Sequence, residues 1–196
     1  MSAKMLVVDP DPRWRVEGLA LARRVRDALC AFRADVDHIG STAVAGLAAK
    51  DVIDLQATVL DLDDPGVAAA LRDLGFRQRE TTTDVPRPGF APGPDEWRKL
   101  YFHEPAGMRA IHLHVRRLGA ANATIGLLQR DFLRADAAVR ADWERMKRAL
   151  AAHTHDRAIY ADLKEPATTL LLRLALDWAK ATRWRPGASD APAGGE

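Results

Sequence analysis

The chain has 196 residues, of which 47% are hydrophobic and 29% are charged, enough apolar material for one sizeable core. Its formal net charge of +2 is nearly balanced, which argues against a protein that coats nucleic acid. No stretch approaches the roughly 20 apolar residues that a membrane-spanning helix needs, and the single cysteine, Cys30, cannot form an internal disulfide. We therefore expect a cytoplasmic protein with neither a membrane nor nucleic acid as its partner.

The N-terminal part of the chain predicts a long helix followed by a strand. Asp11 suits a helix N-cap and Pro12 the first helical turn, so we expect the helix from Pro12 to Phe32. Its apolar face is marked by residues three or four positions apart, Leu19, Ala22, Val25, Leu29 and Phe32. Cys30 falls inside this pattern and is expected to be buried. A short strand is predicted at Val36–Ile39.

A turn rich in small residues separates this strand from a second one. Residues 40–47 have the sequence Gly-Ser-Thr-Ala-Val-Ala-Gly-Leu, and the second strand is predicted from Val52 to about Leu60. Its apolar residues are Ile53, Leu55, Ala57 and Val59, and they alternate with Asp54, Gln56 and Thr58. The alternation predicts one face in the core and one polar face that carries Asp54.

The middle of the chain predicts a helix, three strands and a long loop. Asp64 and Pro65 begin the helix and Gly75 ends it, and a strand is expected at 76–80. Residues 81–94 contain four prolines and two glycines, which predicts a long loop of the kind that often covers or binds a ligand. Two further strands are expected at 97–103 and 109–116, joined by a hairpin-type connection.

The C-terminal part predicts helices from 120 to 184, with the last helix beginning at Pro166. Its buried face is predicted to hold Leu170, Leu171, Leu174 and Trp178. Residues 185–196 have the composition of a disordered tail, which leaves 1–184 as a single domain. The order of elements favours an α+β fold, in which a small mixed β-sheet is flanked by helices and followed by a C-terminal helical lobe.

The turn at Gly40-Ser41-Thr42 is the best candidate for a phosphate-binding site. A glycine lets the backbone approach a ligand closely, and the N–H groups and two hydroxyls can donate to phosphate oxygens. Asp54, on the next strand, is placed to hold Mg²⁺, which prefers carboxylate and phosphate oxygens. The tripeptide by itself is also compatible with an ordinary turn.

Several motifs resemble those of one protein family. Residues 38–50 have the sequence His-Ile-Gly-Ser-Thr-Ala-Val-Ala-Gly-Leu-Ala-Ala-Lys, and with the following Val52-Ile53-Asp54 they closely resemble the signature of the GrpB family. The similarity continues at Pro12 and Trp14, His112-Leu113-His114-Val115, Arg130-Asp131-Phe132-Leu133-Arg134, Tyr160 and Lys164. It covers roughly residues 8 to 180 and implies a nucleotidyltransferase-like fold.

The resemblance also implies which residues act on the ligand. A nucleotidyltransferase pattern has Gly-Ser, a gap, and then two carboxylates on one strand; here Asp54 fits and Gln56 does not. Asp54 is then the catalytic and metal-binding carboxylate, with Mg²⁺ or Mn²⁺ as the expected cation. Basic residues at two family positions, Arg130 and Lys164, are expected to contact phosphate. Lys50, next to the turn, could neutralise phosphate or be a solvated loop lysine.

His112 and His114 share one face of their predicted strand, about 7 Å apart. If this strand lies beside that of Asp54, one aspartate, one glutamine and two histidines form a polar cluster. The cluster could bind a transition metal through Asp54, His112 and His114, donate to phosphate, or be a polar wall without chemistry.

Two functions follow from these residues. The first is a nucleotidyltransferase-like protein that binds a nucleotide or phosphorylated small molecule with a divalent metal. The second is a binding module that has kept the phosphate turn and lost the metal-binding carboxylates. The sequence does not indicate an oligomeric state.

Overall fold

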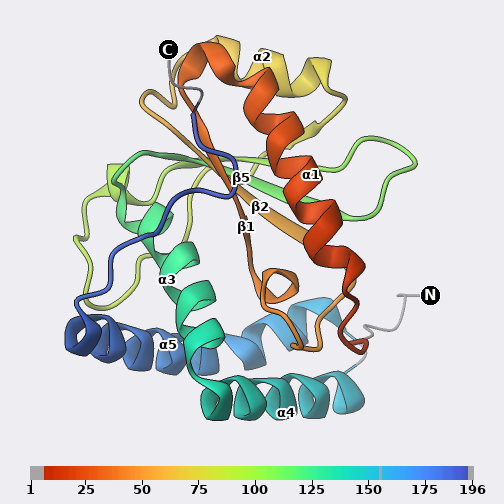
Figure 1. Cartoon of the computed structure of the whole chain (residues 1–196), viewed down its shortest axis with the longest axis vertical. Coiled ribbons are helices and arrows are strands. Elements are labelled where there is room, and N and C mark those ends of the chain that lie inside the picture. The colour runs from red at the N-terminus through yellow and green to blue at the C-terminus, as the bar shows by residue number, and fades with distance from the viewer. Residues whose placement is uncertain (1–6, 155, 194–196) are drawn as a thin grey trace.

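The computed structural model describes residues 7–154 and 156–193, in which five α-helices surround one five-stranded sheet (Figure 1). The helices are α1 (Arg13–Ala28), α2 (Pro65–Asp73), α3 (Ala121–Ala135), α4 (Ala137–His153) and α5 (Arg157–Thr182). The strands are β1 (Asp35–Ile39), β2 (Ile53–Val59), β3 (Arg77–Arg79), β4 (Lys99–His103) and β5 (Ile111–Arg117). Short 3₁₀ helices are η1 (Cys30–Phe32), η2 (Ser41–Ala43) and η3 (Pro94–Glu96).

The sheet is mixed, with the strand order β1-β2-β5-β4-β3. Its central pair, β2 and β5, is parallel, and the other neighbouring pairs are antiparallel. In the central pair Asp54 lies opposite His112, and Gln56 lies opposite His114. The two polar faces that alternation predicted are therefore on the same side of one sheet.

The apolar face of the sheet packs against α1 and α2, which form one layer with the main core. Figure 1 shows α1 crossing this face. The alternating residues Ile53, Leu55 and Ala57 of β2 are fully buried there, as are Ile111 and Leu113 of β5. The period-two pattern thus fixes which face of each strand enters the core.

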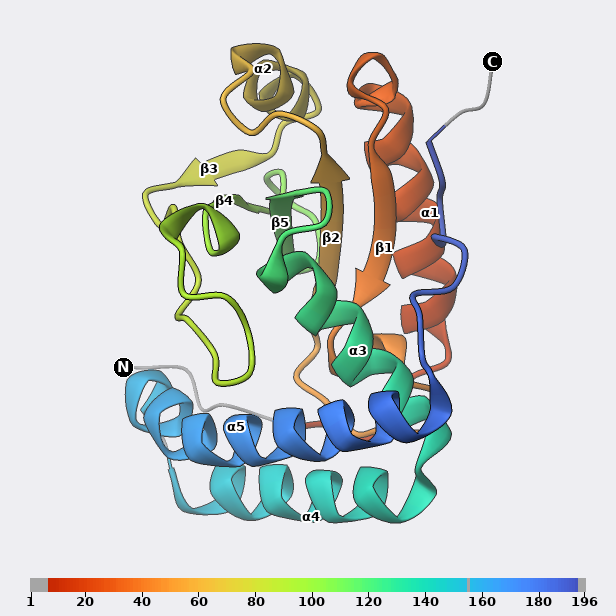
Figure 2. The same ribbon diagram turned by 90° about the vertical axis from the view of Figure 1, so that its left-hand side faces the viewer.

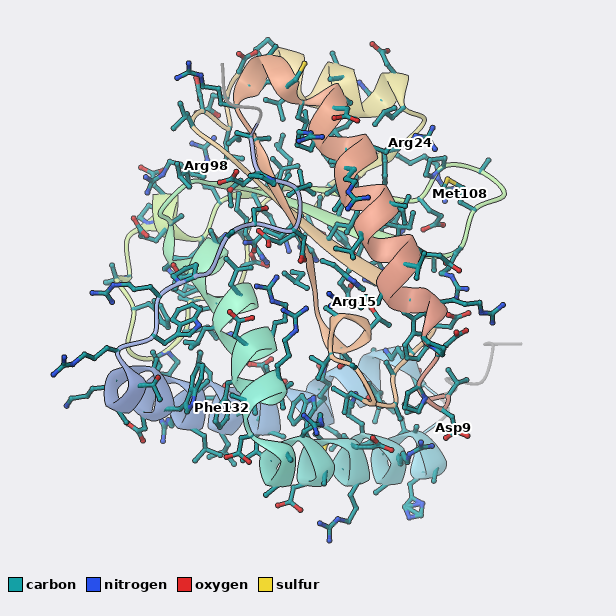
Figure 3. All side chains as sticks on the ribbon, viewed as in Figure 1. Asp9, Arg15, Arg24, Arg98, Met108 and Phe132 are labelled. Atoms are coloured by element: carbon teal, nitrogen blue, oxygen red, sulfur yellow. The ribbon has the colours of Figure 1, made fainter. Side chains whose placement is uncertain are left out.

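The C-terminal helices form the second layer. Helix α3 covers part of the polar face, and Figure 2 shows α4 and α5 side by side across the end of the sheet where β1 ends. Phe132 of α3, labelled in Figure 3, packs against Trp178 of α5 with ring centroids 5.6 Å apart. Val44 and Leu47 of the turn after β1 belong to the same apolar cluster. The turn is therefore held between the sheet and the helical lobe.

The last helix differs from its prediction. Helix α5 begins at Arg157 and contains Pro166 in its interior, because the Asp156 carboxylate caps the N–H groups of Ala158 and Ile159. Leu171 is buried as predicted, but Leu170 and Leu174 are 60% and 51% exposed. The predicted start and half of the predicted buried face are therefore wrong.

The C-terminal segment also differs from its prediction as a disordered tail. Ala191 pairs with Val36 in two backbone hydrogen bonds of 2.9 Å, and Asp190 accepts a hydrogen bond from the backbone N–H of His38. Residues 189–193 thus lie along the free edge of β1, and 194–196 lie outside the described residues. Cys30 is exposed, contrary to expectation, because η1 turns it away from the core. In the described residues no helix is long and apolar enough to cross a bilayer.

Candidate functional site

Gly40 brings the turn after β1 against Asp54. Its φ of 71° lies in the left-handed region, and a Cβ at this position would lie 2.4 Å from Asp54 Oδ2. Glycine is therefore required twice, by the backbone conformation and by the close approach. Ser41 follows directly and begins η2. The structure thus brings together the predicted turn and the predicted carboxylate.

Thr42 is engaged in the protein interior and is not free to meet a ligand. Its hydroxyl donates to the carbonyl of Val52 at 3.0 Å and lies 3.0 Å from His38 Nε2. Burial lowers the pKa of His38 to about 4, so the ring is neutral near pH 7 and its Nε2–H donates to Thr42. The predicted phosphate contact by the Thr42 hydroxyl is therefore replaced by a structural one.

A buried lysine from α4 supports the turn. Lys147 is 3% exposed, and its ammonium donates to Ser41 Oγ at 3.0 Å and to the carbonyl of Ala48. Burial, followed by repulsion from Lys164, lowers the pKa of Lys147 to about 7. A cation therefore stands directly behind Ser41, and its charge changes near neutral pH.

A cleft of about 280 Å³ opens in front of this turn. Gly40, Ser41 and Asp54 line it from the sheet side, and Lys164 lines it from α5. Burial lowers the pKa of Lys164, and the negative charge of Asp54 partly opposes this shift. The structure thus places the predicted Lys164 in the same cleft as Asp54.

Asp54 and His112 meet across the parallel pair, but His114 does not join them. The distance from Asp54 Oδ1 to His112 Nδ1 is 3.1 Å. The His114 ring stacks on Tyr101, with centroids 4.8 Å apart, and its Nδ1 lies 3.4 Å from Lys99 Nζ. Burial, followed by the charge of Arg116, lowers the pKa of His114 well below its ordinary value.

The expected three-ligand metal set of Asp54, His112 and His114 is therefore not formed. The ammonium of Lys99 lies where a metal bound to His114 Nδ1 would be repelled. In the described part of the chain, no group of three or more His, Cys, Asp or Glu side chains is arranged to hold a metal ion. The residues present thus do not fit a preformed metal centre.

The second carboxylate position of the pattern is occupied by a fully buried amide. Gln56 donates from Nε2 to the carbonyl of Ala123 at 2.9 Å, and its Oε1 accepts from Arg116. Both ends of this side chain are therefore used within the protein. Its oxygen faces a guanidinium, which is an arrangement that disfavours a metal cation.

The long loop contributes a second acid, Asp84, to the cleft wall. It accepts hydrogen bonds from Lys99 at 2.6 Å, from Arg116 at 2.9 Å and from Asn122 at 3.1 Å. Burial acts to raise the pKa of Asp84, but Arg116 and Lys99 hold it below its ordinary value. Asp84 is thus an ionised anchor that ties the loop to the polar face of the sheet.

The other two predicted basic residues have different surroundings. Arg130 lines the cleft but is 6% exposed and forms ion pairs with Asp37, Asp131 and Asp190. Lys50 Nζ lies 4.5 Å from the ring centroid of Tyr160, and Lys50 is not among the described residues that line the cleft. Of the three predicted phosphate cations, Arg130 and Lys164 line the cleft with Asp54, and Arg130 is already paired with carboxylates.

Comparison with known proteins identifies the family. The family profile described as GrpB protein matches residues 4–173. The chain belongs to the GrpB family. The crystal structure of GrpB from Enterococcus faecalis has a TM-score of 0.71 with 22% identity, over 89% of this chain and 99% of that one. This similarity confirms the predicted fold class.

Two curated relatives of this GrpB-family chain carry different names. A UPF0157 protein of Streptomyces coelicolor is 39% identical over 162 residues, which are 80% of this chain and 76% of that protein. A dephospho-CoA kinase of Mycolicibacterium paratuberculosis is 33% identical over 199 residues, which are 94% of this chain and 49% of that protein. The chain therefore spans about half the length of the relatives with the latter name.

Sequence reasoning missed two residues of this GrpB-family site, Lys147 and Asp84. Trp143, Lys147 and Ala151 recur at a spacing of four on α4, so the lysine occupies a buried-face position, which is a detectable signal. Asp84 has no such signal, because a loop residue has no periodicity and its partners lie on β4, β5 and α3.

Proposed function

We propose that this GrpB-family chain binds a nucleotide or another phosphorylated small molecule in the cleft between the sheet and α5. The observation that carries the proposal is the convergence of Ser41, Lys147 and Lys164 beside Asp54. Lys164 and the Ser41 hydroxyl at the glycine turn provide donors for phosphate oxygens, and the buried Lys147 adds positive charge behind Ser41. Lys147 acts through Ser41, and Lys164 lies on the cleft wall.

The remaining cleft wall suits the uncharged part of such a ligand. Ile125 and Leu133 of α3, Trp97 and Trp143 line it. Small-molecule sites are mostly apolar clefts of about 300–1,000 Å³ with a few placed polar groups. A volume of about 280 Å³ is just below that range and favours a mononucleotide or a sugar phosphate over a polymer.

Ligand binding is supported better than nucleotidyl transfer. Transfer needs carboxylates that hold Mg²⁺ against the phosphates. Asp54 is placed for this, but Gln56 and Asp84 are both bonded to Arg116. We propose that Asp54 is the residue that would hold Mg²⁺ or Mn²⁺ bound together with the ligand phosphates, where the cation would offset phosphate charge and add modestly to ligand affinity. The chain is then a binding module on a nucleotidyltransferase-like frame, and transferase activity is the second candidate because Asp54 is retained.

Calorimetry with nucleoside triphosphates, sugar phosphates and dephospho-CoA tests the proposal. Dephospho-CoA is included because relatives that share this domain are named for its kinase. Ser41→Ala should weaken phosphate binding by about 1.5–3 kcal/mol, the scale for a hydrogen bond to a charged group. Thr182→Ala, at the exposed end of α5, is the matched control and should leave affinity unchanged.

Asp54→Asn separates the role of the metal from that of the phosphate contacts. We expect it to remove the dependence of ligand affinity on Mg²⁺ or Mn²⁺ while the metal-free affinity persists. No heat with any compound of the panel would refute ligand binding in the cleft. The expected cytoplasmic location is part of the same proposal, since nucleotides and sugar phosphates are concentrated there.

A further inference from the structure

The outer face of α5 carries a stripe of exposed aliphatic side chains. Ile159, Leu163, Leu170 and Leu174 are 53%, 53%, 60% and 51% exposed. At about 100° per residue, these four positions fall within an arc of roughly 60°. Leu171, Leu172 and Ala175 on the inner side of the same helix are buried. A contiguous apolar face of this kind on a folded protein marks an interaction surface.

The spacing of the stripe is symmetric. Its four members are separated by four, seven and four residues, so the order is the same when read from either end of the helix. In an antiparallel pair of α5 helices, Ile159 would face Leu174 of the second copy and Leu163 would face its Leu170. In a two-fold interface, contacts are reciprocal: if Ile159 of one copy meets Leu174 of the other, Leu174 of the first copy meets Ile159 of the second. The symmetric spacing lets all four positions match in this way.

Two oppositely charged residues, Asp162 and Arg173, occupy nearly symmetric positions beside the stripe. Asp162 and Arg173 are exposed, and neither forms an ion pair or hydrogen bond with another residue whose side chain the structure describes. They lie on the same flank of the stripe, in its first and second halves. In the antiparallel arrangement, Asp162 of one copy comes within reach of Arg173 of the other, twice per pair.

We propose that the outer face of α5 is the interface of a homodimer, in which two α5 helices pack antiparallel about a two-fold axis near residues 166–167. The symmetric stripe and the self-complementary charges select a second copy of this chain over an unrelated partner. The proposal is independent of the ligand. Because the contact is one helix per copy, it lies at the small end of specific interfaces, and the dimer dissociates on dilution.

The interface would stand directly behind the cleft. Lys164 and Thr168 project from the other side of α5 into the cleft wall. Pairing of two α5 helices would therefore restrict the movement of the cleft wall that carries Lys164.

Sedimentation velocity over a dilution series tests the apolar stripe. The wild type is expected to convert from dimer to monomer on dilution, and Leu163→Glu/Leu170→Glu to be monomeric throughout. Val16→Glu/Leu60→Glu replaces two side chains of similar exposure, 69% and 62%, on other surfaces and should behave like the wild type. A wild type that is monomeric at the highest soluble concentration overturns the proposal, as does a dimer that survives the α5 substitutions.

Charge reversal tests whether the partner is a second copy in this orientation. Asp162→Arg and Arg173→Asp should each raise the dimer dissociation constant roughly three- to tenfold, because each places like charges together at two positions. The combined variant restores opposite charges and should return the constant to within about twofold of the wild type. Additive weakening in the combined variant would rule out the antiparallel pairing.

Discussion

Lys147 should make phosphate binding at the Gly40-Ser41-Thr42 turn depend on pH. Its pKa of about 7 means that it gains or loses its charge near neutrality. We expect phosphate affinity to fall as pH rises through about 7, because the neutral amine attracts an anion less. In Lys147→Met, the affinity should be lower and nearly constant across this range. Calorimetry at several pH values compares the two; parallel curves would show that Lys147 is not the group that titrates.

The lowered pKa of Lys147 also makes the free energy of unfolding depend on pH. The folded-state pKa lies below the ordinary value of 10.5, so between about 7 and 10.5 the unfolded chain binds more protons than the folded one. The contribution of Lys147 is therefore most unfavourable below pH 7, and it lessens as pH rises through this window. Urea denaturation of wild type and Lys147→Met at the two ends of the window should show a steeper rise in the wild type.

Gln56→Asp distinguishes a missing metal ligand from a structural amide. Aspartate is one carbon shorter, so it would lose the hydrogen bond to Ala123 and present its charge to Arg116. We expect no gain in Mg²⁺ affinity and a loss of about 1–3 kcal/mol in the free energy of unfolding. Metal titration and urea denaturation measure these quantities. Tighter Mg²⁺ binding would mean that the second carboxylate position remains functional.

Helix α5 shows how one local sequence signal can be outweighed by another. Pro166 is a typical helix start, yet here it lies nine residues inside α5, because Asp156 supplies a stronger cap. A proline in a helix interior costs about 3 kcal/mol relative to alanine. Pro166→Ala should therefore raise the free energy of unfolding, by up to roughly that amount. Unchanged or reduced stability would indicate that a bend at this residue is needed for packing.

The strands were predictable because their alternation is complete. Ile53 and Leu55 could face the core only if Asp54 faced the other way, so the polar face was set before any neighbour was known. The exposure of Leu170 and Leu174 was not predictable, since a helix with apolar residues on several sides does not indicate which side has a partner.

The site was predictable where chemistry is local. Gly40, Ser41 and Asp54 lie on consecutive elements, and their approach follows from a hairpin-like path. The burial of Thr42, the bonding of Gln56 and the separation of His114 from Asp54 depend on His38, Arg116 and Lys99. Those contacts are set by tertiary packing, which single-sequence periodicity does not contain.

The C-terminal segment lies along the free edge of β1 and protects that edge of the sheet. Removing residues 185–196 would expose the edge of β1. It would also remove the hydrogen bonds that Asp190 accepts from Arg130 and from the backbone N–H of His38. We expect the truncation to lower the free energy of unfolding by roughly 1–3 kcal/mol and to promote association through the open edge. Removing only residues 194–196 is the control. Equal urea midpoints for both truncations would mean that the segment contributes no stability.

The parallel pairing of β2 and β5 also affects the order in which parts of the site form during folding. The turn at Gly40 and the strand of Asp54 are close in sequence, but His112 reaches Asp54 across a long connection that contains α2, β3 and β4. Closing such a long connection is slow, because chain entropy is lost before the contacts form. We therefore expect a partly folded chain to have the turn without the cleft. Phosphorylated ligand should leave the refolding rate unchanged and slow unfolding instead, since it binds only the completed sheet.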